Sequence, residues 1–235
     1  MIFCRRFLRS PSILRKTTML TTRRSLLTER ASPSLCSTVP EKPYTLVLQE
    51  DRFFCNSSWH FLFKKSFPAC YSTEYCYQEL ELKNLKSSLL EMSEDLMQHP
   101  SIVLVARGPL VSWVAQFYLE SLPLSGLVMV DPFVEPSTEI MKEIRRQYRI
   151  ENTCTSDVGL LTQIESGFET RQLKLEPGVV PMLVLMSQKN EHMRRASKLT
   201  AERHHDPNGS FGVQSDDIDV NPIAQIQTWI ENEVS

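Results

Sequence analysis

Apolar and polar positions between residues 101 and 132 follow a pattern that predicts a strand, a helix and a second strand. Residues 102–105 form a short apolar run rich in β-branched side chains, which is typical of a strand buried on both faces. Pro109 suits the first position of a helix, and apolar residues recur after it at helical spacing. Residues 127–130 form the second apolar run. This succession predicts two parallel strands joined by a helical crossover.

Strand-like and helix-like segments continue to alternate along the chain from residue 44. Because they alternate, we expect one α/β domain, built as a three-layer α/β/α sandwich around a mostly parallel central sheet. Residues 49–52 are polar and predict a turn after the first strand. The other expected strands are residues 44–48, 69–77, 179–186 and 211–214, and the other expected helices are residues 59–63, 82–99, 137–149, 191–203 and a segment that starts at Pro222.

The first thirty residues differ in composition from the rest of the chain. Between Met1 and Thr28 there are seven basic residues and no acidic one, and Ser and Thr are frequent. This composition is typical of a mitochondrial targeting segment, with a disordered basic arm as the alternative. We therefore expect residues 1–30 to direct the protein to the mitochondrial matrix or the matrix side of the inner membrane. Residues 31–43 are expected to form a Ser- and Pro-rich linker, and residues 44–235 the domain.

The charge balance changes when the targeting segment is set apart. Residues 1–30 carry eight of the 26 Lys and Arg and one of the 28 Asp and Glu, which leaves 18 basic and 27 acidic residues and a net charge of −9. Such an acidic domain is a poor general binder of phosphate backbones, so any RNA contact must come from a local patch or from the N-terminal arm. No apolar run approaches the roughly 20 residues that a transmembrane helix needs.

The cysteines give no sign of a metal site. Their spacing does not suggest zinc, and in a reducing compartment we expect free thiols, most of them buried. The six cysteines are Cys4, Cys36, Cys55, Cys70, Cys76 and Cys154. No cofactor is expected.

Residues 43–234 resemble the α/β-hydrolase fold in the order and spacing of their segments. Residues 103–108, Val-Leu-Val-Ala-Arg-Gly, resemble the nucleophile-elbow strand of that family. The resemblance implies the fold of these enzymes, with a short cap between residues 133 and 176. The other matching segments are residues 45–48 and 57–59 (first strand and oxyanion loop), 126–132 (the strand after the elbow), 181–185 (the strand that leads to the catalytic acid) and 221–222 (the segment after the catalytic histidine).

Catalysis in this family needs a nucleophile, a histidine, an acid and backbone N–H groups that hold an oxyanion. The elbow pattern G-x-S-x-G becomes Ala-Arg-Gly-Pro-Leu, so Gly108 replaces the nucleophile and Pro109 lacks the N–H that would donate to an oxyanion. The usual His-Gly of the oxyanion loop is replaced by Gln49-Glu50-Asp51, which places negative charge where negative charge would develop. The resemblance therefore implies a degenerate member without the catalytic triad.

Few residues remain as a candidate acid or histidine. After residue 186 only Glu191 could serve as the acid, and Ser215-Asp216-Asp217 occupy the position of the histidine. His204 and His205 lie about ten residues too early, at the end of a charged helix. Histidines are favoured near a helix C-terminus, so a solvated helix end is the alternative to a base or a ligand.

Three further features have a structural interpretation beside a functional one. Ser112 is the serine nearest the elbow, but it lies one turn into the helix, which favours a packing role. Asp131 ends a strand at the carboxyl edge, where some family members place an acid, although Asp-Pro also indicates a turn. The aromatic residues Phe53, Phe54, Trp59, Phe61 and Phe63 indicate core more than a ligand pocket.

Four basic residues lie three or four positions apart along one expected helix, as they would on a solvated face. In an otherwise acidic domain they are also the best candidate for docking to an acidic protein or to RNA. They are Lys142, Arg145, Arg146 and Arg149.

The sequence favours a non-catalytic protein, imported into mitochondria and used as a structural or assembly subunit. The mitochondrial ribosome, its assembly machinery and a respiratory or ATP-synthase complex all fit this hypothesis, with other proteins of the complex as partners. Two alternatives stay open. One is an active hydrolase or esterase with a displaced triad, such as Glu191 with His204 or His205. The other is a module that binds a small ligand in the former active-site cleft.

Overall fold

The computed structural model describes residues 44–51, 58–66, 74–151, 173–188, 190–218 and 221–234. The expected targeting segment and linker lie outside these residues, as do Phe53, Phe54 and every cysteine except Cys76. Cys76 is buried and free.

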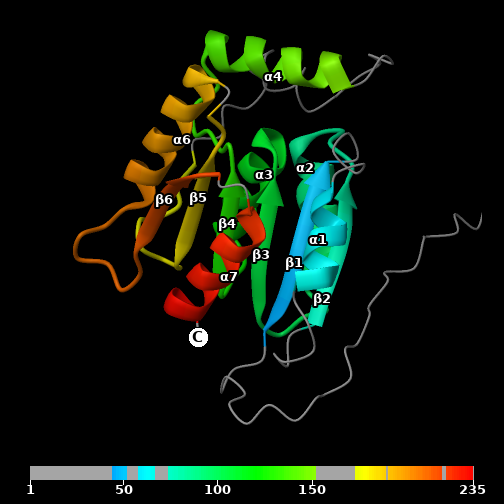
Figure 1. Cartoon of the computed structure of the whole chain (residues 1–235), viewed down its shortest axis with the longest axis vertical. Helices are drawn as coiled ribbons and strands as arrows, with labels where there is room; N and C mark the ends of the chain where they lie inside the picture. The colour runs from blue at the N-terminus through cyan, green and yellow to red at the C-terminus, as the bar shows by residue number, and fades with distance from the viewer. Residues whose placement is uncertain are drawn as a thin grey trace, which may run out of the picture.

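Six strands of the described residues form one sheet, and every neighbouring pair is parallel (Figure 1). They are Thr45–Asp51 (β1), Glu74–Leu80 (β2), Ile102–Arg107 (β3), Gly126–Val130 (β4), Met182–Met186 (β5) and Val213–Asp217 (β6). Their order in the sheet is β2-β1-β3-β4-β5-β6. The order reverses between β1 and β3, and in open parallel sheets such a switch point leaves a crevice at the carboxyl ends of the strands.

Helices cover both faces of the sheet. They are Ser58–Ser66 (α1), Leu85–Leu96 (α2), Pro109–Leu119 (α3), Thr138–Glu151 (α4), Glu191–His204 (α6) and Pro222–Glu233 (α7). Residues of α1 and α7 share a buried cluster with one face of the strands, and residues of α2, α3 and α6 share a second cluster with the other face. α4 lies across the carboxyl ends of the strands, at the top of Figure 1. The α/β/α sandwich that the sequence predicts is therefore confirmed.

The central strands hold the core of the domain. Leu104, Val128 and Leu185 lie in the adjacent strands β3, β4 and β5, and all three are fully buried. Side chains alternate between the two faces of a strand, so Leu104 packs toward α2 and α3 while Val128 and Leu185 pack toward α1 and α7. Both faces are covered, which explains the continuous apolar runs in these strands.

The structure corrects the limits of several elements. The polar turn expected at residues 49–52 is wrong, because residues 49–51 are the last, fully buried residues of β1. They stay in the sheet because β2 pairs with all three of them and β3 pairs with Gln49 and Glu50. β5 begins at residue 182 rather than 179, after Pro181, which has no N–H to contribute to a ladder. β6 covers residues 213–217 rather than 211–214, and β2 extends to residue 80.

Gly126 allows α7 to pack closely on the sheet. A Cβ atom at this position would lie 3.1 Å from the Trp229 ring and 3.1 Å from a methyl group of Val234. The ring is nearly buried in this position. The Trp229 ring therefore packs directly on the backbone of β4, where any larger residue than glycine would crowd it.

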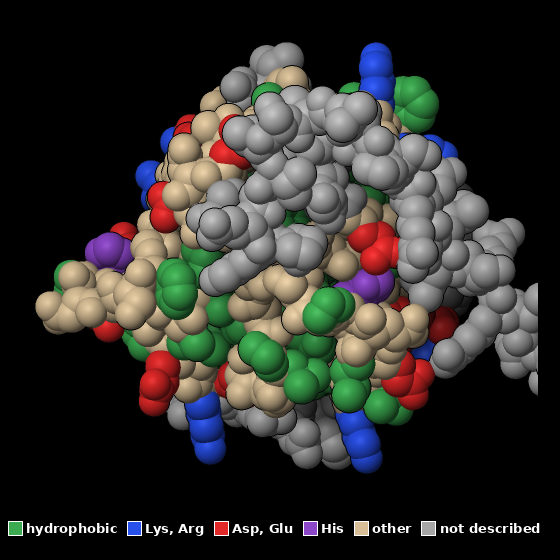
Figure 2. Space-filling view, turned by 90° about the horizontal axis from the view of Figure 1, so that it is seen from below, with side chains coloured by type: hydrophobic (Ala, Val, Ile, Leu, Met, Phe, Trp, Pro, Cys, Tyr) green, Lys and Arg blue, Asp and Glu red, His purple; other side chains and the backbone are tan. Residues whose placement is uncertain are grey.

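Apolar side chains also gather at the amino edge of the sheet, on the face seen in Figure 2. Val179 and Phe211 are 44% and 42% exposed and line a groove of about 220 Å³ together with Tyr44 and Val234. Tyr44 precedes β1 and Gly108 follows β3, so this groove and the elbow lie at opposite ends of the sheet. No helix in the described part of the chain is long and apolar enough to span a bilayer.

Candidate functional site

Gly108 forms the sharp turn between β3 and α3 at the carboxyl edge. Its φ of 101° and ψ of 154° lie in a region of backbone conformation that is essentially restricted to glycine. It is the N-cap residue of α3 and offers no side-chain hydrogen bond to the helix, and Pro109 follows at the first helical position without an N–H. The elbow thus presents neither an attacking atom nor a donor at the next residue.

A cleft of about 570 Å³ opens beside Gly108. This volume is in the range of small-molecule sites. The wall is built from the carboxyl ends of β3, β4 and β5, from α4, and from the start of α6. Its polar and aromatic residues include Trp59, Arg107, Asp131, Glu143, Arg146, Gln147, Ser187, Gln188 and Asn190, and its apolar residues include Val130, Met193 and Ile218.

Arg107, the last residue of β3, pairs with the carboxyl end of β1. Its Nη1 atom lies 2.5 Å from Oε1 of Glu50, which is fully buried at the end of β1. Its guanidinium carbon lies 4.8 Å from the centre of the Trp59 ring, a cation–π contact. The sequence predicts negative charge at Glu50, and in the structure that charge is matched by a cation of the neighbouring strand.

The other polar residues at the end of β1 also bond within the protein. The hydroxyl group of Tyr148 donates to Oδ2 of Asp51 at 2.5 Å, and Nε2 of Gln49 donates to Oε1 of Gln78 at 3.2 Å. Because Tyr148 belongs to α4, its bond to Asp51 ties the helix that crosses the carboxyl edge to the sheet.

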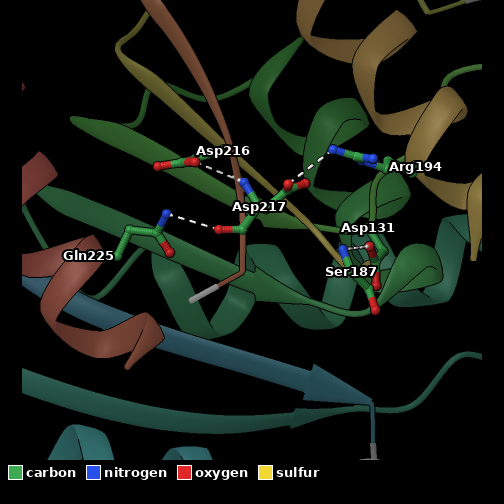
Figure 3. Close-up of polar contacts among 6 residues, drawn as sticks. All are labelled: Asp131, Ser187, Arg194, Asp216, Asp217 and Gln225. Atoms are coloured by element: carbon green, nitrogen blue, oxygen red, sulfur yellow. Dashed lines mark hydrogen bonds and ion pairs between the residues drawn. The ribbon is translucent and has the colours of Figure 1, made fainter. Parts of the chain in front are cut away.

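Asp131 follows β4 and lies on the wall of the cleft. Its φ of 52° is unusual for a residue with a side chain, although Asp tolerates this conformation better than most. Oδ1 accepts a hydrogen bond from the backbone N–H of Ser187 at 2.7 Å (Figure 3). Burial raises the pKa of the carboxyl group to about 6, against the smaller opposite effect of the Ser187 bond.

Residues 215–217, which the sequence resemblance would place at the family's histidine, are part of β6. Arg194 of α6 donates to Oδ2 of Asp217 at 3.0 Å (Figure 3). The Asp217 backbone is also bonded, because its N–H donates to Oδ1 of Asp216 at 2.9 Å and its carbonyl accepts from Nε2 of Gln225 at 3.1 Å. These bonds fix the carboxyl end of an edge strand, and Asp217 takes part in them through both its side chain and its backbone.

His204 is a core residue rather than part of a solvated helix end. It is fully buried, and its Nε2 lies 3.0 Å from Oε1 of Gln116 in α3. The amide group of Gln116 donates to the carbonyls of Ser112 and Phe133, so Nε2–H of His204 is the donor to Oε1. Burial lowers the pKa of His204 to about 4, with a smaller effect from Arg203. The imidazole is therefore neutral at physiological pH.

The candidate acid and histidines do not meet. Glu191 and His204 are the first and last residues of α6, and a helix of this length separates its ends by about 20 Å. Glu191 and His205 are exposed. Neither histidine lines the cleft beside Gly108, and none of the other described histidines does.

Ser112 has a structural role that its hydrogen bonds explain. It is fully buried, and its hydroxyl group lies 3.0 Å from the carbonyl of Ala106 and 3.2 Å from that of Val130. Those two carbonyls belong to β3 and β4, so Ser112 holds α3 against both strands.

The basic residues of α4 are exposed where the structure describes them. These are Lys142, Arg145 and Arg146, whereas the side chain of Arg149 lies outside the described part. Arg146 is bonded to Glu143 through both carboxylate oxygens, at 2.7 and 2.8 Å, and this bond holds the pKa of Glu143 below its usual value. Lys142 and Arg145 are the other members of the run whose exposed side chains the structure describes.

The aromatic residues divide between core and surface. Trp59 and Phe63 are buried in the layer beneath α1, whereas Phe61 is 67% exposed.

The ion pair of Arg107 with Glu50 and the hydrogen bond of Tyr148 to Asp51 did not follow from the sequence. The alignment of Arg107 beside Glu50 across β1 and β3 could have been found only from the strand register.

Comparisons with known proteins agree with the architecture. No protein-family model and no curated protein matches the chain. Solved structures match most of it: an esterase from Thermogutta terrifontis at 15% identity and a TM-score of 0.54, over 89% of this chain and 94% of that one. MenH from S. aureus matches at 13% identity and 0.52, over 84% and 97%, and the type II thioesterase BorB from the borrelidin cluster at 12% and 0.51, over 87% and 96%. The chain has the α/β-hydrolase fold.

Proposed function

We propose that this protein is a non-catalytic α/β-hydrolase-fold protein that serves as a structural or assembly subunit of a mitochondrial complex. The observation that carries the proposal is the elbow, where Gly108 supplies no nucleophile and Pro109 supplies no N–H. The acidic residues at the end of β1 are bonded within the fold, and no described histidine lines the cleft. A fold that keeps its architecture while its elbow carries no reacting atom is suited to docking.

The mitochondrial part of the proposal rests on the N-terminal sequence. Its seven basic residues, without an acidic one up to Thr28, suit import. Residues 1–30 fused to a passenger protein should deliver it to mitochondria. Replacing the basic residues of the segment by Gln should leave the passenger in the cytosol, and cytosolic residence of the unaltered fusion would refute the localisation.

The exposed basic residues of α4 are the proposed docking surface. Lys142 and Arg145 lie on a domain whose net charge is negative, so they offer a local attraction to an acidic protein or to RNA. The double change of Lys142 and Arg145 to Glu should release the protein from its complex. Lys198→Glu on the exposed side of α6 alters charge elsewhere and should not.

The absence of catalysis is tested with the purified full-length protein. It should not react with a broad fluorophosphonate probe and should not hydrolyse simple esters or thioesters above background. Labelling of the wild-type protein that is lost in Ser112→Ala would point to a serine hydrolase and refute the proposal. Turnover that is lost on replacement of Glu191 or His205 would support the displaced triad instead.

Membership of a complex is tested with the tagged protein in its own cells. On a native gel or a gradient it should migrate well above its 27.1 kDa mass, and mass spectrometry of the purified material would identify the complex. Migration as a free monomer in gently lysed mitochondria would contradict the subunit role without bearing on the absence of catalysis.

A further inference from the structure

Asp131 differs from the other charged groups that line the cleft. Arg107 is paired with Glu50, and Arg146 is paired with Glu143. Asp131, by contrast, accepts only the backbone N–H of Ser187 and forms no ion pair with another described residue. The two cations on the wall are thus compensated by their own carboxylates, whereas the charge of Asp131 is not.

The backbone holds this carboxylate at the cleft. Asp131 has a φ of 52° and is followed by a proline, and a residue before proline is itself restricted in conformation. A non-glycine residue in this conformation persists only when its surroundings determine it. The Ser187 N–H fixes one carboxylate oxygen, and Asp131 forms part of the wall of the 570 Å³ space.

We propose that the cleft binds a small organic ammonium ion, with the carboxylate of Asp131 as its anchor. The ammonium group would supply the countercharge that Asp131 lacks, and Ile218, which is partly exposed on the cleft wall, offers apolar contact to the body of the ligand. This binding is independent of the proposed role as a subunit. It requires no catalysis.

Other classes of ligand fit the wall less well. A divalent metal needs several oxygen or nitrogen ligands, and no group of three acidic, His or Cys residues in the described ranges could hold one. An anion would meet the charge of Asp131, while both arginines are already held by carboxylates. Burial raises the pKa of Asp131 to about 6, so the group is ionised at neutral pH and gains most from a cation.

Three probes of one shape test the charge requirement with the full-length protein. They are 4-fluorobenzylamine, 4-fluorobenzyl alcohol and 4-fluorobenzoate, and their binding is measured by fluorine NMR at pH 7.5. The amine should bind at least about tenfold more tightly than the alcohol or the benzoate, because only the amine forms a charge-assisted bond with Asp131. Equal binding of the three probes, tighter binding of the benzoate, or no binding of the amine up to 10 mM (roughly the weakest affinity expected of so small a ligand) would overturn the proposal.

Two matched variants locate the anchor. Asp131→Asn keeps the acceptor for Ser187 N–H and tolerates the backbone conformation, but removes the charge, so it should bind 4-fluorobenzylamine at least about tenfold more weakly. Asp216→Asn makes the same charge change at an exposed carboxylate of β6 and should bind the amine as the wild type does. Undiminished binding by Asp131→Asn, or an equal loss in Asp216→Asn, would show that the amine is held elsewhere. The comparison of the three probes needs no variant and stands if a variant fails to fold.

Discussion

The carboxyl edge of the sheet has two halves, one at the end of β1 and one at the ends of β4 and β5, and their carboxylates have different partners. At the end of β1, Glu50 is fully buried, and its charge is matched by Arg107 of the next strand. At the end of β4, Asp131 lies on the wall of an open cleft, and the backbone N–H of Ser187 is its bonding partner. Gly108 stands between them, at the end of β3.

This difference separates a structural from a ligand-accessible use of the same kind of side chain. The charge of a buried carboxylate with a matched cation is compensated within the fold and is not available to a ligand, whereas a carboxylate that faces a cavity without a cation keeps its charge available. The half of the edge at the end of β1 is therefore closed, and the half formed by β4 and β5 is open. Changes of single residues on the two sides should have opposite effects on stability.

The largest effect is expected in the closed half. Arg107→Met should lower the free energy of unfolding by about 3–5 kcal/mol, because it leaves the buried charge of Glu50 without its cation. Chemical denaturation followed by tryptophan fluorescence would measure the loss.

The double variant Glu50→Gln with Arg107→Met separates the lost charge from lost packing. It should recover most of the stability, since neither charge is then left alone in the interior. A double variant no more stable than Arg107→Met would mean that packing of the Arg107 side chain on Trp59 outweighs the ion pair.

His204, like Glu50, is a titratable group buried inside the fold, and its contribution to stability should depend on pH. Its folded-state pKa of about 4 lies below the usual histidine value of 6.5, so the unfolded chain takes up a proton first. The stability that it contributes is fully present above pH 6.5 and is lost as the pH falls toward 4, by about 3 kcal/mol in all.

The contribution of His204 is isolated by comparison with His204→Gln, whose amide keeps a donor near Gln116. The difference in unfolding free energy between the two proteins should shrink between pH 7 and pH 5. A constant difference over that range would mean that His204 is not held neutral in the fold.

The sequence predicts the regular part of the fold and misses the polar edge. Apolar runs such as residues 102–105 and 127–130 predict their strands, because their length and their β-branched composition both indicate a buried strand. Gln49, Glu50 and Asp51 look like a turn because their polar side chains find partners only through tertiary contacts with β2, β3 and α4. His204 misleads for the same reason, since its partner Gln116 is 88 residues away.

At the site, the sequence identifies Gly108 and Pro109 because they occupy one local motif. It does not identify the pairing of Arg107 with Glu50, which helps decide that Asp131 is the carboxylate of the cleft left without a cation among the described residues. The order of the strands determines that pair and does not follow from local pattern, whereas Arg146 and Glu143 lie three positions apart on one helix.

In the open half, Asp131→Asn should stabilise the protein by about 2–3 kcal/mol at pH 7. Burial raises the folded-state pKa to about 6, above the usual Asp value of 3.8. The stability linked to the protonated carboxyl group is therefore present below pH 3.8 and is lost as the pH rises through 6. Asparagine has no charge to lose, and it keeps the acceptor for Ser187. The gain measured by denaturation should therefore vanish near pH 4; a gain that is the same at pH 4 and pH 7 would have another cause.

The smallest effect on stability is expected at the boundary between the halves. Gly108→Ser should cost about 1–3 kcal/mol, because a side chain is forced into a backbone region that glycine alone adopts readily. Gly212→Ser is the matched control, since nothing lies within 4 Å of a Cβ atom there, and it should change stability by less than about 0.5 kcal/mol.

The Gly108→Ser protein should also fail to hydrolyse esters. No described histidine lines the cleft to accept the proton of the new hydroxyl group. Pro109 would still lack an N–H to donate to an oxyanion, and the loss of one such donor alone typically costs about 10²–10³ in rate. Ester turnover by Gly108→Ser, or full stability equal to that of the control, would mean that the elbow retains the geometry of an active enzyme.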